Sequence, residues 1–84
     1  MRGSHVSNSQ NLAVNLRRLR AECLLSQADL AVRAGEPFSQ QYVSHLERGR
    51  WPYRREHIGQ LARALDVPES ELLRKVRRRV PTAA

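Results

Sequence analysis

Residues 38–49, FSQQYVSHLERG, hold the signals that start, orient and end one short helix. Ser39 suits the position before the helix, because its hydroxyl can accept a hydrogen bond from a free N–H of the first turn. Phe38 and Val43 stand on either side of this cap with the spacing of a hydrophobic staple, which fixes how the chain enters the helix. Gly49 can adopt the left-handed conformation that ends many helices. The stretch therefore predicts a short helix between Ser39 and Gly49.

The two sides of this helix differ in their chemistry. Val43 and Leu46 lie three positions apart and form the inward side. The side chains left for the outward side are all polar: Gln40, Gln41, Ser44, His45 and Arg48. Glutamine and arginine are side chains that make paired hydrogen bonds to the edges of adenine and guanine. We therefore expect this helix to lie in the major groove of DNA. The residues expected to read bases are Gln40, Gln41, Ser44 and His45.

Composition and charge suit this expectation. A chain of 84 residues makes one small domain, and 40% hydrophobic residues with four Gly and four Pro are ordinary for a globular protein. The formal net charge is +7, and 14 of the 15 basic residues are arginine. Arginine binds phosphate and guanine through two parallel hydrogen bonds, so the charge favours a polyanionic partner. A GC-rich genome would also explain the choice of arginine over lysine, but not the surplus of positive charge.

Several classes of protein and of site are disfavoured by the composition. Cys23 is the single cysteine, which excludes an internal disulfide and indicates a reducing, cytoplasmic compartment. No apolar run approaches the ~18 residues of a membrane-spanning helix. His45 and His57 lack further metal-ligating neighbours. We expect no metal, cofactor, small-molecule ligand or membrane. We also expect residues 1–8 to be a disordered leader or tag, residues 9–80 the domain, and residues 81–84 a tail.

Another helix is expected on the N-terminal side of residues 38–49. Ser26 can cap it, and Asp29 stands where the acid of a capping box would. Gly35 ends it, and Pro37 prevents its continuation. Two helices of about eight to ten residues joined by a tight turn containing Gly are typical of a helix-turn-helix.

Three further helices complete a predicted all-α bundle of five. The N-terminal one should start after Asn8 or Ser9 and carry one continuous apolar stripe, formed by Leu12, Leu16, Leu19 and Cys23. The fourth should run from about Arg55 to Leu65, with Ile58, Leu61, Ala62 and Leu65 inward. The fifth should follow Pro68, carry Leu72, Leu73 and Val76, and end in the basic run of residues 74–79.

Three blocks of this chain resemble one family. They are LSQADLA at residues 25–31, VSHLERG at 43–49 and LARALDV at 61–67, in order and at nearly the family's spacing. The chain is similar in these blocks, across about residues 12–73, to the Cro/cI-type regulators, also called the xenobiotic-response-element type. The resemblance implies a lambda-repressor-like, five-helix DNA-binding domain with a helix-turn-helix. It also implies a bacterial or phage-encoded protein associated with the nucleoid.

The resemblance assigns roles to particular residues. Gln27 would contact a phosphate and brace the reading helix, and Arg20 would form a structural ion pair with Glu47. Apart from the resemblance, further residues are expected at phosphates from their positions around the reading helix: Ser39, Tyr42, Arg48, Arg50, Arg54 and Arg55. Two departures from the family stand out. The turn after Gly35 is about two residues longer, with Glu36 and Pro37 inserted, and the stretch after Pro52 is about one residue longer.

The resulting functional expectation is a sequence-specific transcriptional regulator that binds double-stranded DNA as a homodimer. Its operator would be pseudo-palindromic, with half-site centres ~10 bp or a multiple apart. Dimerisation is expected through Leu72, Leu73 and Val76. Size and analogy slightly favour a controller protein of a restriction–modification system. A phage-type repressor and the DNA-binding antitoxin of a toxin–antitoxin pair are the alternatives. No carboxylate pair, nucleophile–base arrangement or phosphate-cradling glycine loop indicates an enzyme.

Overall fold

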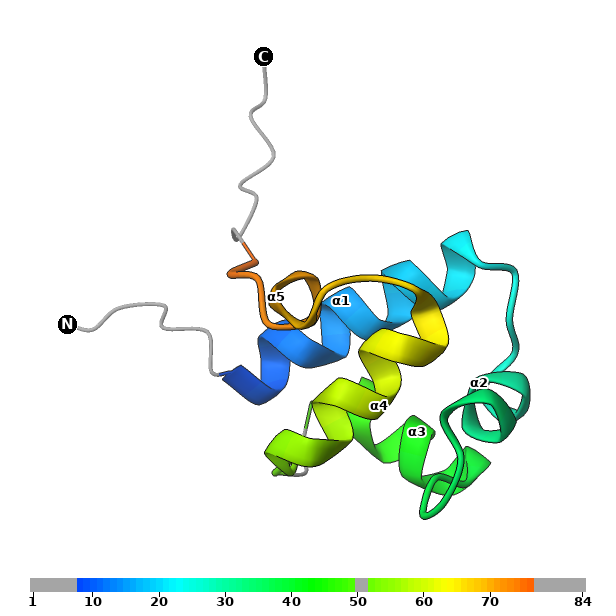
Figure 1. The fold of residues 1–84 in the computed structure, drawn as a ribbon. Coiled ribbons are helices and arrows are strands. Elements are labelled where there is room, and N and C mark those ends of the chain that lie inside the picture. The colour runs from blue at the N-terminus through cyan, green and yellow to red at the C-terminus, as the bar shows by residue number, and fades with distance from the viewer. Residues whose placement is uncertain (1–7, 50–51, 77–84) are drawn as a thin grey trace, which may run out of the picture.

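The computed structural model describes residues 8–49 and 52–76. Within these ranges it contains five helices and no strand (Figure 1). The helices are α1 (Asn8–Glu22), α2 (Gln27–Ala34), α3 (Gln40–Glu47), α4 (Arg55–Leu65) and α5 (Glu69–Leu72). The predicted all-α fold with a helix-turn-helix is confirmed. The expectations for Arg50, for the part of the basic run beyond residue 76 and for both chain ends fall outside the described residues.

The helix-turn-helix formed by α2 and α3 begins each of its helices with a serine cap. Asp29 N–H donates to Ser26 Oγ at 2.9 Å, and Ser26 N–H donates to the Asp29 carboxylate at 3.3 Å, so the capping box is complete. Tyr42 N–H donates to Ser39 Oγ at 3.1 Å. Each cap satisfies an N–H that has no partner inside its helix. Both helices are eight residues long, as their capping signals predict.

A common core holds α3 in place. Val43 and Leu46 are 0% and 1% exposed and face apolar side chains of the other helices. Those side chains include the predicted inward residues of α1 and α4: Leu12, Leu16, Leu19, Ile58, Leu61, Ala62 and Leu65. Burying one such aliphatic side chain stabilises the fold by about 1.5–3 kcal/mol. The inward side of α3 is therefore committed to the core, and its polar side faces outward.

The prediction that Cys23 belongs to the core stripe is wrong. The stripe holds for Leu12, Leu16 and Leu19, but α1 ends at Glu22 and Cys23 is exposed. The chain reverses at Leu24, which has a left-handed backbone with φ of 60°. Cys23 N–H still donates to the carbonyl oxygen of Leu19 at 3.1 Å, and its Sγ lies 3.9 Å from the carbonyl oxygen of Leu65, but at the end of the helix the residue stays exposed to solvent.

The prediction of a long fifth helix is also wrong among the described residues, because α5 has only four. Asn15 Nδ2 donates to the carbonyl oxygens of Leu72 at 2.9 Å and Arg74 at 2.8 Å. The N–H of Val76 donates to Asn11 Oδ1 at 3.0 Å. These backbone groups would be used inside a longer helix, and here they bind the side of α1 instead. Both asparagines are buried and were not singled out from the sequence.

Leu72 is corrected from an interface residue to a core residue. Its side chain is 0% exposed within the single chain. Leu73 and Val76 are partly buried and lie beyond the end of α5. The single turn of α5 packs against α1 and α4 (Figure 1), so this small bundle has room for Leu72 in its own core.

Replacing Asn15 with alanine is expected to lower the free energy of unfolding by about 1–3 kcal/mol. The reason is that two carbonyl oxygens, on Leu72 and Arg74, lose the amide that satisfies them. Thermal unfolding followed by circular dichroism measures the change. Asn15→Asp keeps the shape but places a carboxylate beside the same two carbonyls, so it should be at least as destabilising. An Asn15→Ala protein as stable as the parent would contradict the structural role of these bonds.

Candidate nucleic-acid interface

A partly buried polar network holds α3 against α1 and α2. Arg20 of α1 donates from Nε to Glu47 Oε2 at 2.6 Å and from Nη2 to Glu47 Oε1 at 3.0 Å. Its third nitrogen, Nη1, donates to the carbonyl oxygen of Leu25 at 2.9 Å. Gln27 Nε2, at the start of α2, donates to Glu47 Oε1 at 3.0 Å. The ion pair and the bracing contact expected from the resemblance are thus both present, and they join α1 and α2 to α3.

The electrostatics of this network favour the charged state of its arginine. The hydrogen bond to Glu47 raises the pKa of Arg20, although burial opposes the rise. The Glu47 side chain is 4% exposed and that of Arg20 is 21% exposed. A carboxylate this well buried requires a cationic partner and hydrogen bonds, and it has both. Glu47 is the single acid of α3, so its inward position leaves the outward side of this helix without negative charge.

The residues expected to read bases occupy the outward part of α3. Gln40 and Gln41, in its first turn, are exposed. Ser44 and His45 are half-buried one turn later. Helical spacing places Gln41, Ser44 and His45 on the side away from Val43 and Leu46. The start of α3 therefore presents two exposed amide side chains, each with donor and acceptor groups.

Tyr42 has a different environment from the one expected at a phosphate. Its hydroxyl lies 2.7 Å from Nδ1 of His57 on α4. The ring of His57 meets the rings of Phe38 and Tyr42 edge-on, with centroids 5.3 and 5.5 Å apart, and Phe38 and Tyr42 are 5.1 Å apart. Burial raises the pKa of Tyr42, and the positive charge of Arg54 opposes the rise. Tyr42 therefore joins α3 to α4.

Arginines expected at phosphates surround the two ends of the α3–α4 connection. Arg48, Arg54 and Arg55 are exposed, and Arg54 occupies the position before α4 without capping it through its side chain. Arg50 falls outside the described ranges. Gly49 has a left-handed backbone with φ of 71°, and a Cβ there would lie 3.4–3.5 Å from Ala13 and Gln10. This close approach places the end of α3 against the first half of α1.

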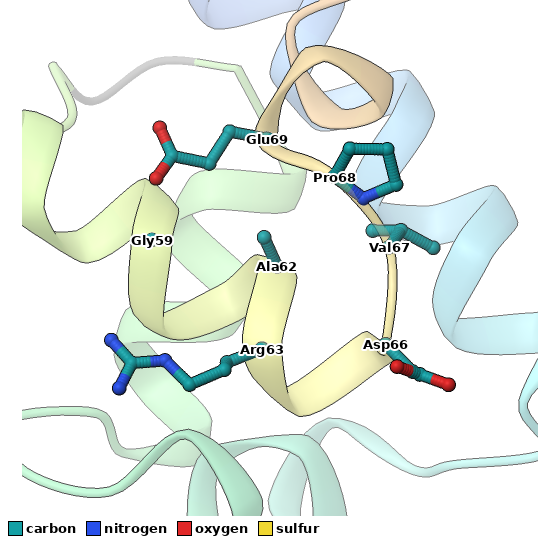
Figure 2. Close-up of a pocket in the computed structure, with 7 residues that line it drawn as sticks. All are labelled: Gly59, Ala62, Arg63, Asp66, Val67, Pro68 and Glu69. Carbon is teal, nitrogen blue, oxygen red and sulfur yellow. The ribbon is translucent and has the colours of Figure 1, made fainter.

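The opposite flank of α4 carries a pocket whose lining includes two acids and one arginine. Gly59 is two positions after His57, which turns it about 200° around the helix. An open pocket of 480 Å³ lies on this flank, between α4 and the start of α5 (Figure 2). It is lined by Gly59, Ala62, Arg63, Asp66, Val67, Pro68 and Glu69. The acids Asp66 and Glu69 thus stand away from the His57 flank that contacts α3.

Neither a metal site nor a membrane span emerges from the part of the chain that the structure describes. No group of three or more His, Cys, Asp or Glu side chains in it could hold a metal ion. No helix there is long and apolar enough to cross a bilayer.

Sequence reasoning missed His57 and Gln60 as neighbours of the helix-turn-helix. Gln60 Nε2 donates to the carbonyl oxygens of Ala34 at 3.0 Å and Glu36 at 2.8 Å. The two residues are three positions apart on α4, so they share one flank. This spacing is the one sequence signal that could have grouped His57 with Gln60. It is too common among helical residues to identify a pair.

Comparisons with known proteins agree with this architecture. The helix-turn-helix domain family designated HTH_31 matches residues 11–79, which is most of the chain. The chain belongs to the helix-turn-helix family of transcriptional regulators. It is 46% identical over 59 residues to an uncharacterized HTH-type transcriptional regulator, y4dJ, of Sinorhizobium fredii (strain NBRC 101917 / NGR234). That alignment covers 70% of this chain and 74% of the relative.

A solved structure extends the comparison to three dimensions. The hypothetical transcription factor NHTF from Neisseria is 31% identical and superposes with a TM-score of 0.74. The superposition covers 87% of this chain and 86% of the Neisseria chain. The helix-turn-helix of this family is formed here by α2 and α3.

Proposed function

We propose that this helix-turn-helix protein binds a specific double-stranded DNA sequence through α3 and regulates transcription from that site. The observation that carries the proposal is the orientation of α3. Its single acid, Glu47, is buried and paired, while Gln40 and Gln41 are exposed. A helix of this kind can approach base edges without electrostatic repulsion, and its first turn is the part that reaches them in helix-turn-helix docking.

Phosphate contacts are proposed for the side chains around α3. Arg48, Arg54 and Arg55 are exposed and basic. Ser39 lies exposed beside the same surface. Gln27 uses one amide hydrogen for Glu47 and has a second for a phosphate oxygen. Such contacts position a protein on the duplex but do not distinguish sequences.

A homodimer is proposed because one copy of α3 covers little DNA. Eight residues span about 12 Å, which equals three to four base pairs at about 3.4 Å each. Two copies related by a two-fold axis would read a pseudo-palindrome with half-site centres ~10 bp or a multiple apart. We place the subunit contact near Leu73 and Val76, next to α1. Sedimentation equilibrium should give twice the mass of one chain, and a strict monomer on DNA would contradict this arrangement.

The function is tested by selecting binding sites from a library of random DNA duplexes. We expect one pseudo-palindromic sequence to be enriched. In fluorescence anisotropy that duplex should bind 10³-fold or more tightly than a scrambled duplex, a ratio ordinary for specific regulators. Affinity for both duplexes should fall steeply with salt because phosphate binding releases counterions. Equal affinity for the selected and scrambled duplexes would contradict the proposal.

Control of a restriction–modification operon is the biological role that we propose, on the strength of the resemblance stated above. Its test is whether the selected sequence occurs upstream of neighbouring methyltransferase and endonuclease genes. Occurrence among phage genes or beside a toxin gene would instead support the phage-type repressor or the antitoxin.

A further inference from the structure

The turn between α2 and α3 is the part of the helix-turn-helix that the resemblance described above predicts to be longer than usual. It contains the additional residues Glu36 and Pro37 and begins at Gly35, whose φ is 84°. Phe38 N–H donates to the carbonyl oxygen of Gly35 at 2.9 Å. A longer turn has more conformational freedom. Contacts from outside the turn are therefore needed to fix the position of the first turn of α3 relative to α2.

Two residues of α4 supply such contacts. The side-chain amide of Gln60 donates two hydrogen bonds to this segment. One goes to the carbonyl oxygen of Ala34 at the end of α2, and the other goes to the carbonyl oxygen of Glu36 inside the turn. Because an amide nitrogen has two hydrogens, one side chain bridges both points. His57 lies one helical turn earlier on α4 and contacts Phe38 and Tyr42. The bracket formed by His57 and Gln60 therefore contacts the end of α2, the turn, and the first turn of α3.

We propose that His57 and Gln60 are positioning residues for DNA recognition. They hold the first turn of α3 in the place from which Gln40 and Gln41 meet the bases. This inference rests on the proposed function. Bidentate hydrogen bonds to bases tolerate displacements of only about 0.5 Å. Loss of the contacts made by His57 and Gln60 would therefore misalign the side chains that read the bases. Phosphate contacts by arginines tolerate such displacements better, because a long flexible side chain can follow its phosphate.

Gln60→Glu tests the bracket with almost no change in shape. A carboxylate has no hydrogen to donate and would face two carbonyl oxygens. We expect the ratio of affinities for the selected and scrambled duplexes to fall about tenfold or more. Arg63→Gln is the matched control, since it also lowers the net charge by one and lies exposed on the same helix. The control should weaken binding to both duplexes equally and leave their ratio unchanged.

His57→Phe and Tyr42→Phe test the second half of the bracket. Each variant keeps a ring in the aromatic cluster and loses the bond between the hydroxyl and Nδ1. Because both remove the same bond, the double variant should reduce the affinity ratio no further than either single variant does. Additive reductions would contradict action through this bond.

Folding is checked separately by thermal unfolding. If Gln60→Glu is unfolded at the assay temperature, Gln60→Met replaces it, because Met has a similar length without a donor or a charge. A folded Gln60 variant that retains the full affinity ratio would overturn the inference while leaving the proposed function intact. An unaltered protein that shows no preference for any duplex would instead overturn the proposed function.

Discussion

Glu47→Ala is expected to lower the free energy of unfolding by about 3 kcal/mol. Removing one partner of a buried ion pair costs about 3–5 kcal/mol because the remaining charge is left unpaired. The lower end applies here, since 21% of the Arg20 side chain is exposed and water can solvate part of its charge. Gln27 also loses its acceptor. In a domain of this size the loss corresponds to a fall in Tm of more than about 12 °C.

Urea and thermal unfolding, followed by circular dichroism, measure this effect. Glu22→Ala is the matched control, because Glu22 forms an exposed ion pair with Arg18 at 3.3 Å. An exposed pair of this kind contributes about 0.3–0.5 kcal/mol. The loss of stability caused by Glu47→Gln should lie between those of Glu47→Ala and Glu22→Ala, since glutamine keeps one acceptor oxygen but lacks the charge. Equal losses for Glu47→Ala and Glu22→Ala would show that the inner pair is no more important than a surface one.

Gln41→Ala is expected to reduce discrimination between the selected and scrambled duplexes by about 1–3 kcal/mol per half-site. In the proposed homodimer the change occurs twice, so the total is about 2–6 kcal/mol. Affinity for the scrambled duplex should stay nearly constant, because Gln41 carries no charge. Stability should also change little, since its side chain is exposed. Fluorescence anisotropy on both duplexes, at one fixed salt concentration, gives the ratio.

Arg54→Ala is the contrasting variant for this measurement. It removes an exposed positive charge next to α4, and it should weaken binding to both duplexes by the same factor. Its affinities should also depend less steeply on salt, since fewer counterions are released. If Gln41→Ala behaved like Arg54→Ala, Gln41 would contact the DNA backbone rather than a base.

Local signals were sufficient to predict most of the helices. Ser26, Asp29 and Ser39 act within three residues of their own positions, and the predicted bounds of α4, Arg55 to Leu65, are those observed. Arg20 and Glu47 are 27 positions apart in the sequence, and only the resemblance predicted their interaction. Where a local pattern was extended beyond its element, as at Cys23, the expectation was wrong.

Within residues 38–49, the cap, the apolar side and the polar side of α3 follow from neighbours within one or two helical turns, so the local sequence was sufficient to predict them. The tertiary structure decided how that helix is held. Gln60, His57, Asn11 and Asn15 form bonds between residues 15 to 65 positions apart. Polar side chains of these types can bind many partners, and only the packing of the helices brings one particular carbonyl or hydroxyl within reach.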